Sequence, residues 1–218
     1  MKENSLDISN LRQNYKRSFL LEKDIHQNPF TQFEQWFKEA LDAQILEPNA
    51  FSLATSTHDG FPSVRIVLLK EITSEGLVFF TNYNSKKGKE LTTNPKCSIV
   101  FFWGELERQV RIQGVATKLT KHESFAYFKS RPKESQIGAT ISPQSEIIPS
   151  REYLDNLFVT STDKYKDIRL PLPDHWGGFI IKPINFEFWQ GRENRLHDRI
   201  MYQLMPHTKD WQIIRLAP

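Results

Sequence analysis

The side chains best suited to bind a ligand or take part in a reaction lie between Phe188 and Arg199. There, two aromatic residues are followed closely by three arginines, one histidine and two acids. Arginine presents a rigid fork of donors to a phosphate, Trp189 offers a flat apolar wall, and His197 titrates near neutrality. This combination suits a planar, anionic ligand. A solvated turn between two strands is the alternative, but a second basic and apolar run, from Arg65 to Lys70, suits the same kind of partner.

Two upstream segments carry further basic groups. On a regular strand, Arg65 and Lys70 would point to opposite faces, so one strand could serve two anionic groups. Ser85 is the expected N-cap of a helix, yet Lys86, Lys87 and Lys89 crowd the positive end of its dipole. An anion bound at the free backbone N–H groups would resolve that conflict, whereas harmless exposed lysines are the alternative.

A third segment combines hydroxyl and guanidinium groups. Tyr127 and Arg131 are four residues apart on one helical face, and Ser135 follows one turn later. Together they could clamp a phosphate, although a half-buried tyrosine and a helix-ending arginine would look the same. Neutral polar side chains that could bond the edge of a heterocycle stand at Gln109, Gln144 and Ser145. No group of His, Cys, Asp and Glu has the spacing of metal ligands, so we expect no metal site.

Composition restricts the class of protein. The chain has 218 residues, enough for one good-sized domain, which we place at 28–218 after a polar, basic and mobile arm at 1–27. Lys and Arg number 29 against 26 Asp and Glu, a net charge of +3 that favours local anion sites and no nucleic-acid partner. The single cysteine, Cys97, excludes an intrachain disulfide and is expected in a strand. No apolar run approaches the roughly 18 residues of a membrane span, which indicates a soluble, cytoplasmic protein with no membrane partner.

Hydrophobic periodicity predicts a mainly β protein with peripheral helices. A helix is expected from about Pro29, with Thr31 and Glu34 as a capping box and a buried stripe that runs from Phe30 to Ile45 through Leu41. Period-two patterns, separated by turns, predict an antiparallel barrel or sandwich. The expected strands are at about 51–57, 63–72, 77–82, 96–103, 107–118, 178–189, 199–205 and 211–216. Short helices are expected at about 85–93, 121–130 and 150–165.

Several of these segments, in this order, resemble one family. They are Arg65 to Lys70, Phe79 to Asn82, Ser85 to Lys87, Leu106 to Val110, Tyr127 to Pro132, Ser135 to Ala139, Phe188 to Gly191 and Arg195 to Arg199. Together they are similar to the pyridoxine/pyridoxamine 5′-phosphate oxidases, over a range from about Leu11 to Pro218. The resemblance implies an antiparallel split β-barrel that binds FMN and works as a homodimer, with two cofactor sites at the subunit interface.

The resemblance also implies an activity and a set of site residues. The activity is oxidation of pyridoxine or pyridoxamine 5′-phosphate to pyridoxal 5′-phosphate, with hydride transfer to FMN and reoxidation by O2 to give H2O2. FMN would contact Arg65, Ile66, Val67, Leu68, Leu69, Lys70, Phe80, Thr81, Lys86, Lys87, Gln109, Gln144, Ser145, Trp189 and Arg199. The vitamin B6 phosphate would contact Arg12, Tyr15, Lys70, Tyr127, Arg131, Ser135, Arg195, Leu196 and His197. Arg195 and His197 are the expected catalytic residues.

Two positions depart from the family pattern, and two other functions stay open. Lys86 stands where the family commonly has arginine, and Gln13 replaces a frequent second arginine of the arm. Lysine keeps the charge but loses bidentate geometry toward a phosphate. A flavin reductase on the same fold, or a non-catalytic binder of FMN or pyridoxal phosphate, would share much of the pattern. A generic flavin reductase needs no second phosphate clamp, so the residues that discriminate against it are Tyr127, Arg131, Ser135, Arg195 and His197.

Overall fold

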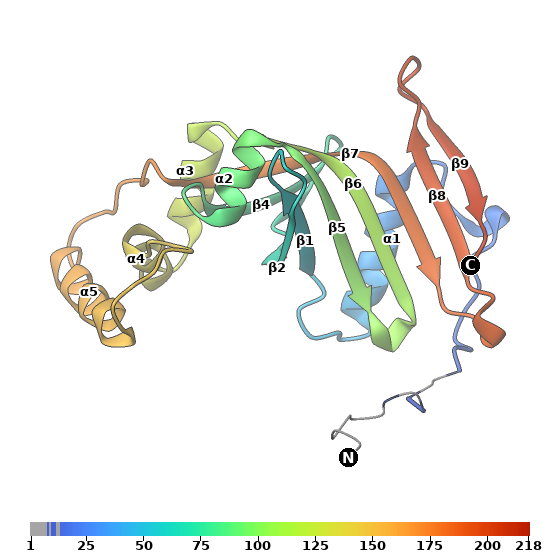
Figure 1. The fold of residues 1–218 in the computed structure, drawn as a ribbon, viewed down its shortest axis with the longest axis horizontal. Coiled ribbons are helices and arrows are strands. Elements are labelled where there is room, and N and C mark those ends of the chain that lie inside the picture. The colour runs from blue at the N-terminus through green and yellow to red at the C-terminus, as the bar shows by residue number, and fades with distance from the viewer. Residues whose placement is uncertain (1–7, 9, 12–13) are drawn as a thin grey trace.

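A computed structural model describes residues 8, 10–11 and 14–218, and its centre is one antiparallel sheet that curls into a half-barrel (Figure 1). The strand order is β2-β1-β5-β6-β7-β4-β3, while β8 pairs with β7 and β9 pairs with β8. The strands are β1 (Ala50–Ser56), β2 (Pro62–Leu68), β3 (Glu71–Ile72), β4 (Leu77–Asn82), β5 (Lys96–Trp103), β6 (Arg108–Lys118), β7 (Trp176–Gln190), β8 (Asp198–Leu204) and β9 (Trp211–Leu216). The predicted mainly β, antiparallel architecture is confirmed.

The sheet divides along β7. One edge of β7 pairs with β6 from Phe179 to Gln190. Its other edge pairs first with β4, from Trp176 to Ile181, and later with β8, from Asn185 to Gln190. A strand has only two edges, so β4 and β8 pair with different stretches of the same edge of β7. The sheet forks between these two stretches. This fork is the split in the barrel.

One predicted strand is interrupted. The pattern predicted a continuous strand at about 63–72, but β2 ends at Leu68 and β3 begins at Glu71. Leu69 is only 5% exposed and packs in the core, while the Lys70 N–H donates to the Val78 carbonyl oxygen. The chain therefore leaves its pairing with β1 at this point and joins β4. The sequence does not show such a change of partner, because the apolar run from Ile66 to Leu69 continues through the break without a turn residue.

The helices are α1 (Pro29–Asp42), α2 (Lys86–Thr93), α3 (Lys121–Ser130), α4 (Lys133–Ile141) and α5 (Arg151–Lys164), with short 3-10 turns at Glu22–Asp24, Gly104–Leu106 and Glu193–Arg195. The predicted N-caps at Ser85 and Ser150 and the capping box of Thr120 with Glu123 are confirmed. The capping box proposed for Thr31 is wrong, because the Asn28 side chain accepts the Phe30 N–H and caps α1 three residues earlier.

Helix α1 packs against the concave side of the half-barrel through aromatic side chains. Phe33 lies 5.0 Å from Phe101 and Trp36 lies 5.2 Å from Phe188, measured between ring centroids. Leu41, predicted in the buried stripe, is 53% exposed. The helical period of 3.6 residues centres the buried face on Phe33, Trp36 and Ala40 instead. Cys97 is buried in β5, as predicted for a strand cysteine.

The described part of the arm lies against the barrel. Leu20 is 4% exposed, and its N–H donates to Asp198 Oδ2 while its carbonyl accepts from Arg215. Arg12 and Gln13 lie outside the described residues. Among the residues that the structure describes, no helix is long and apolar enough to cross a membrane.

The cap of α1 can be tested by substitution. Asn28→Ala should lower the free energy of unfolding by about 1 kcal/mol, because it removes the acceptor for the Phe30 N–H. Thr31→Ala is the matched control and should change it by less than about 0.5 kcal/mol. Urea unfolding of both variants measures the difference, and a larger loss for Thr31→Ala would restore the rejected capping box.

Candidate active site

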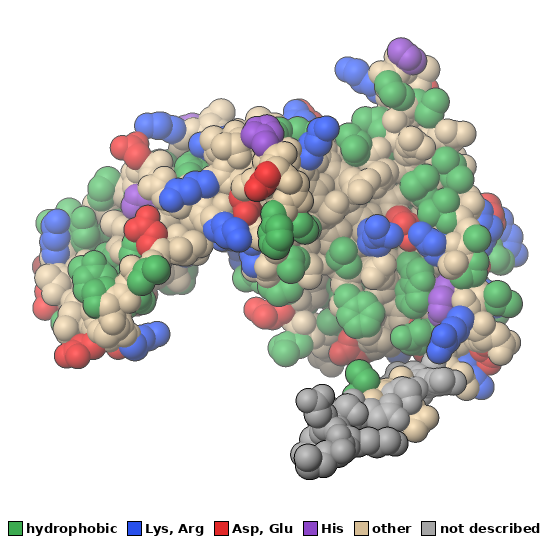
Figure 2. Space-filling model, in the orientation of Figure 1, with side chains coloured by type: hydrophobic (Ala, Val, Ile, Leu, Met, Phe, Trp, Pro, Cys, Tyr) green, Lys and Arg blue, Asp and Glu red, His purple; other side chains and the backbone are tan. Residues whose placement is uncertain are grey.

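A cavity of about 830 Å³ opens between the helical end of the molecule and the sheet. Figure 2 shows the surface hollowed between α4–α5 and the β1–β2 side. The cavity brings together many predicted site residues, namely Arg65, Ile66, Val67, Leu68, Lys70, Phe80, Thr81, Lys87, Tyr127, Arg131, Ser135 and Gln144. The lining also includes residues that sequence reasoning missed, namely Asn82, Pro132, Gly138, Ala139, Ser142 and Trp176.

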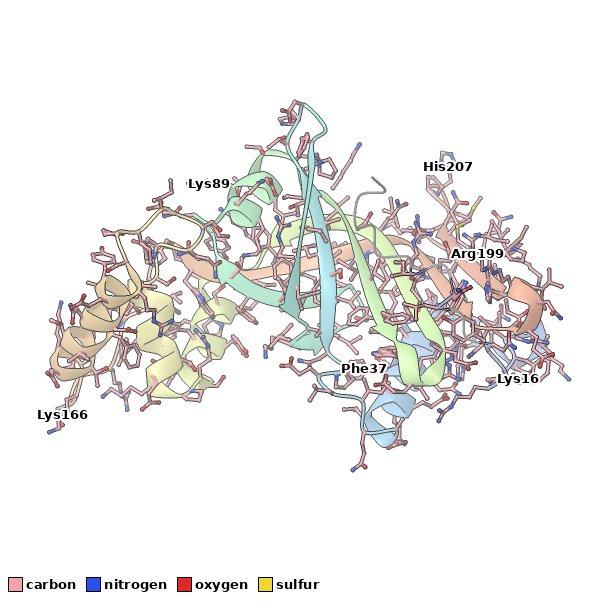
Figure 3. All side chains as sticks on the ribbon, turned by 60° about the horizontal axis from the view of Figure 1, so that its bottom comes forward. Lys16, Phe37, Lys89, Lys166, Arg199 and His207 are labelled. Atoms are coloured by element: carbon pink, nitrogen blue, oxygen red, sulfur yellow. The ribbon has the colours of Figure 1, made fainter. Side chains whose placement is uncertain are left out.

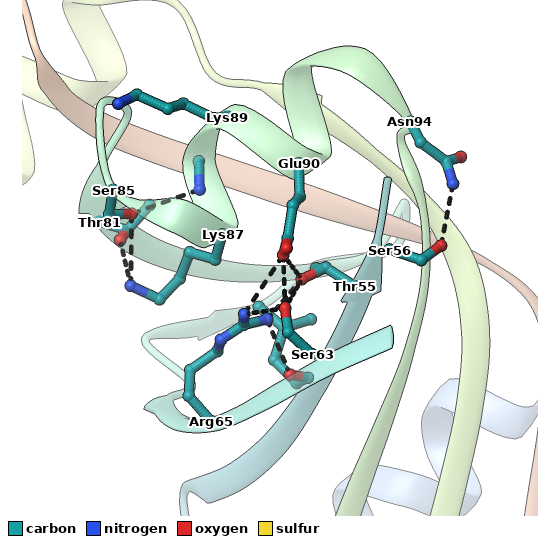
Figure 4. Close-up of polar contacts among 12 residues, drawn as sticks. Thr55, Ser56, Ser63, Arg65, Thr81, Ser85, Lys87, Lys89, Glu90 and Asn94 are labelled. Carbon is teal, nitrogen blue, oxygen red and sulfur yellow. Dashed lines mark hydrogen bonds and ion pairs between the residues drawn. The ribbon is translucent and has the colours of Figure 1, made fainter. Parts of the chain in front are cut away.

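Arg65 is held by a polar network at the floor of this cavity (Figure 4). Its guanidinium donates to the Leu53 carbonyl at 3.1 Å and to the Ser63 hydroxyl at 2.6 Å, and it pairs with Glu90 at 3.3 Å. Glu90 is 3% exposed and also accepts from the Thr55 and Ser63 hydroxyls. The carboxylate balances one buried cation, and sequence reasoning missed it because α2 and β2 meet only in the tertiary structure.

Arg65 and Lys70 line the same cavity, and the expectation that they serve opposite faces is wrong. The alternation of side chains holds only along an unbroken strand. Because β2 ends at Leu68, the backbone turns before it reaches Lys70. Two cations are thereby directed toward one ligand space.

Lys87 is a buried lysine beside Arg65. Its Nζ donates to Gln144 Oε1 at 3.0 Å and to Thr81 Oγ1 at 3.2 Å. Burial, together with the positive charge of Arg65, lowers the pKa of Lys87 from 10.5 to about 8, an effect that Glu90 only partly offsets. Among the described residues no carboxylate lies within ion-pair distance of Lys87. The ammonium thus lacks a matched anion on the protein side.

Arg131 is the second cation that lacks a partner among the described residues, in this case a hydrogen-bond acceptor for one of its guanidinium nitrogens. It follows α3 and precedes Pro132, which keeps its backbone extended and ends the helix. Its guanidinium lies over the Trp176 ring, 4.9 Å from the centroid, and burial lowers its pKa. Nη1 is buried without a hydrogen-bond partner in the described part of the chain. A buried donor without an acceptor is rare in proteins, so this atom indicates where an anionic ligand group belongs.

Flat rings form the wall beside Arg131. The Phe80 and Tyr127 rings stack with centroids 3.9 Å apart, and Phe80 and Trp176 stack at 5.4 Å. Tyr127 and Ser135 come from α3 and α4, so Pro132 turns the chain to bring both helices onto the cavity. Cations beside stacked rings can hold a planar molecule that carries a phosphate.

A second cluster gathers where β7 ends and β8 begins. Trp189 lies 4.6 Å from His197, and the Tyr15 ring meets each of them edge-on at 5.7 Å. The Arg192 N–H donates to His197 Nδ1 at 3.1 Å. Burial, together with the Arg195 charge, lowers the pKa of His197. The imidazole is therefore held in its neutral form over more of the physiological pH range.

The other members of this cluster are placed by strand register and by a strained turn. Gln109 and Arg199 flank Trp189 on its two neighbouring strands. Arg199 Nε donates to Glu187 Oε1 at 2.9 Å, an ion pair that sequence reasoning missed. Arg195 is exposed with a φ of 61°, and Leu196 is 69% exposed.

Six predicted cofactor residues lie outside the lining of the cavity, and three of them, Gln109, Trp189 and Arg199, belong to the second cluster. Leu69 packs in the core, Lys86 is exposed on α2, and Ser145 is exposed with a φ of 73°. None of the second cluster lines the cavity either. The described residues contain no group of three or more His, Cys, Asp or Glu that could hold a metal ion.

The two clusters lie far apart within one chain. Trp176 and Trp189 stand 13 steps apart on β7, which corresponds to roughly 40 Å of extended strand before bending. Figure 3 shows Lys89 of α2 and Arg199 of β8 on either side of β5 and β6. A single chain cannot close one small-molecule site over both clusters.

Comparison with known proteins decides the family. Residues 37–156 match the model of the pyridoxamine 5′-phosphate oxidase family, and residues 176–218 match a pyridoxine 5′-phosphate oxidase C-terminal dimerisation region. The chain belongs to the pyridoxamine 5′-phosphate oxidase family. It is 52% identical to a pyridoxine/pyridoxamine 5′-phosphate oxidase of Trichormus variabilis, covering 97% of this chain and 98% of the relative.

A second relative and two solved structures are also similar to this chain. The enzyme of that same name from Aliarcobacter butzleri is 51% identical, covering 98% of this chain and all of its own length. The crystal structure of PhzG from Burkholderia lata, in complex with tetrahydrophenazine-1-carboxylic acid, superposes with a TM-score of 0.86 at 30% identity, covering 92% of this chain and 98% of that one. An FMN-binding protein of Nostoc punctiforme, with a TM-score of 0.69 at 14% identity, covers 85% of this chain and 97% of its own and shares the fold.

The protonation state of Lys87 in the folded chain can be tested through the pH dependence of the free energy of unfolding. Between about pH 8 and 10.5 the unfolded chain still holds the Lys87 proton that the folded, ligand-free chain has lost. The free energy of unfolding of the wild type, relative to Lys87→Met, should therefore rise with pH by on the order of 2 kcal/mol across this range. Chemical unfolding of both proteins at several pH values gives the difference, in which other titrating groups cancel. A difference that does not change with pH would contradict the depressed pKa.

Proposed function

We propose that this chain is an FMN-dependent oxidase that converts pyridoxine or pyridoxamine 5′-phosphate to pyridoxal 5′-phosphate. The observation that carries the proposal is a pair of cations beside a stack of aromatic rings, the buried Lys87 and the half-buried Arg131, which lack an anionic partner among the described residues. The cofactor and the substrate are both flat, aromatic and phosphorylated. The names of full-length relatives at about 50% identity support the same activity.

The residues present fit both phosphorylated rings. The cofactor phosphate would be met by Arg65 and Lys87 beside the N-terminus of α2, where backbone N–H groups add to the positive field. The substrate phosphate would be met by Arg131, Tyr127 and Ser135, with Lys70 between the two ligands. The remaining cofactor contacts are assigned to Ile66, Val67, Leu68, Phe80, Thr81 and Gln144 of the cavity and to Gln109, Trp189 and Arg199 of the second cluster. Leu69, Lys86 and Ser145, which lie outside the lining, stay predictions of the resemblance.

A homodimer would complete the site. The second cluster lies too far from the cavity of its own chain, so it would complete the cavity of a partner. The match of residues 176–218 to a dimerisation region supports this arrangement. Exposed apolar side chains on the outer face of the sheet, Val64, Ile66 and Phe102, offer an area that a second subunit would cover.

Bound FMN would supply the redox chemistry, namely hydride acceptance from the substrate's 4′ carbon and reoxidation by O2 to give H2O2. The chain supplies position, charge and exclusion of water. Arg195, on its left-handed turn, would direct a cation to the substrate ring. His197 accepts at Nδ1, so its neutral ring carries the proton on Nε2 and can hydrogen-bond the substrate edge. Trp189 and Tyr15 would keep water from the reacting face.

Two other functions remain to be separated from this one. A flavin reductase with a different substrate, or a non-catalytic FMN or pyridoxal phosphate binder, would use the same fold. Tyr127, Arg131 and Ser135 form a second phosphate clamp, which a generic flavin reductase does not need. A binder would keep the clamp without turning over.

Purified protein should be yellow and should consume O2 when pyridoxine 5′-phosphate is added. Arg195→Leu should lower kcat by about a hundredfold while FMN retention changes less than about twofold, because the Arg195 cation acts on the substrate. Oxygen uptake and bound-flavin absorbance measure the two effects. Colour without oxygen uptake would support the binder, and equal losses in both quantities would refute the role of Arg195.

Complementation between subunits tests the composite site. Arg131→Leu disables the cavity half and Arg195→Leu disables the other half, so each variant alone should be nearly inactive. When the two are co-expressed with different tags, about one quarter of all sites should be intact, since mixed dimers hold one unaltered site each. Oxygen uptake by the doubly tagged fraction measures the recovery. Absence of recovery in mixed dimers would show that both halves act within one chain.

A further inference from the structure

Glu107 forms a contact with the N-terminal arm that the proposed chemistry does not use. It ends the 3-10 turn Gly104–Leu106 in the left-handed conformation, with a φ of 55°. Its Oε2 atom accepts the backbone N–H groups of Lys16 at 2.9 Å and of Arg17 at 3.0 Å. These residues lie about 90 positions upstream, so the contact joins the arm to the turn between β5 and β6.

The same residue also joins the turn that follows β7. The Glu107 carbonyl oxygen accepts the Gly191 N–H at 2.7 Å and the Gln190 side chain at 3.2 Å. One residue therefore holds the arm through its side chain and the end of β7 through its backbone. Among the described residues of the segment 14–19, Lys16 and Arg17 are the two whose backbone N–H groups have an acceptor in the protein, and for both it is this carboxylate.

Gly191 leaves the space into which Tyr15 fits. A Cβ atom at position 191 would lie 2.7 Å from Tyr15 Cγ and 2.8 Å from Tyr15 Cβ, closer than carbon atoms approach. Tyr15 thereby reaches Trp189 and His197. The absence of a side chain at Gly191 leaves room for the Tyr15 ring. The hydrogen bonds from the next two residues to Glu107 fix the position of the backbone beside Tyr15.

The segment makes other contacts as well. The Arg17 guanidinium donates to the Glu105 carbonyl oxygen at 2.6 Å in the same turn, a bond that replacement of either glutamate side chain leaves in place. The ion pair of Lys16 with Glu193 spans 3.4 Å between two well-exposed side chains, and such pairs contribute little. The buried Asp198 and the exposed Arg215 fix the chain at Leu20, five residues beyond Tyr15. Charge-assisted bonds to a carboxylate are stronger than neutral ones.

We propose that Glu107 is a positioning residue that anchors the N-terminal arm through the Lys16 and Arg17 amides and thereby sets Tyr15 against Trp189 and His197. Its kinetic consequence rests on the proposed function, in which this cluster faces the substrate. Glu107 itself contacts none of the reacting groups. Its loss should free the arm, weaken substrate binding and leave the chemical step less affected.

Limited trypsin digestion of the full-length, FMN-loaded protein tests directly whether the arm is held in place. Trypsin cleaves after Lys16 and Arg17, the two residues whose amides bind Glu107. Glu107→Ala should speed cleavage there about tenfold relative to wild type. Glu105→Ala is the matched control, since it removes an equal charge from the same turn but from a side chain without a hydrogen bond in the described structure. Glu107→Gln keeps an acceptor oxygen and should fall between the two.

Cleavage after Lys166, at the opposite end of the molecule (Figure 3), serves as the internal reference. Intact-mass analysis of fragments that begin at Arg17 or Ser18 gives the ratio of the two rates, so general destabilisation does not imitate release of the arm. Gly191→Ala fills the Tyr15 space while keeping the Glu107 carboxylate, although its Cβ also comes within 3.0 Å of Glu107 Cβ, and it should also raise this ratio. An unchanged ratio in Glu107→Ala would overturn the anchor.

Kinetics separate this proposal from the proposed function. In Glu107→Ala, KM for pyridoxine 5′-phosphate should rise about tenfold while kcat changes less than about threefold, and Glu107→Gln should recover part of the loss. A fall in kcat alone would overturn the positioning role. If the wild type oxidises no vitamin B6 phosphate, the proposed function fails, and the trypsin ratio still decides whether Glu107 anchors the arm.

Discussion

The constraint on which the site depends is the length and rigidity of β7. This strand of 15 residues pairs with β6 along most of one edge and with β4 and β8 along the other. Because its backbone hydrogen bonds are satisfied by three neighbours, it cannot fold back to bring Trp176 near Trp189. The chain therefore holds the cavity and the second cluster at a fixed separation. In the proposed homodimer, symmetry would place each cavity opposite the second cluster of the partner.

The second organising feature is buried positive charge. Glu90 balances Arg65, but Lys87 and Arg131 stay without a carboxylate partner among the described residues. Burying such groups costs stability unless an anion joins them. Binding of a phosphorylated ligand would thus remove a cost already present in the folded chain. The same reasoning explains why neutral acceptors, Thr81 and Gln144, surround Lys87 without replacing that anion.

Local signals predicted most of the secondary structure. Ser85, Thr120 and Ser150 cap their helices as expected, because a cap depends on a few neighbouring residues. The prediction was wrong where a distant partner decides. Asn28 caps α1 in place of the Thr31 box, and the chain changes strand partner after Leu68. Glu90 and Glu107 were missed for the same reason, since each acts on a segment that the sequence does not place beside it.

The sequence by itself determined the family, the mainly β class and the residue types that suit two flat phosphorylated ligands, because these follow from motif order, periodicity and side-chain chemistry. Only the tertiary structure decided which of those residues share a cavity. Periodicity assigns a side chain to one face of a strand, but it does not say which strands pair or where a sheet forks. In the folded chain Arg65, Lys87 and Arg131 line one cavity, while pairing of β7 with β8 sets Trp189 beside Arg199 in a separate cluster.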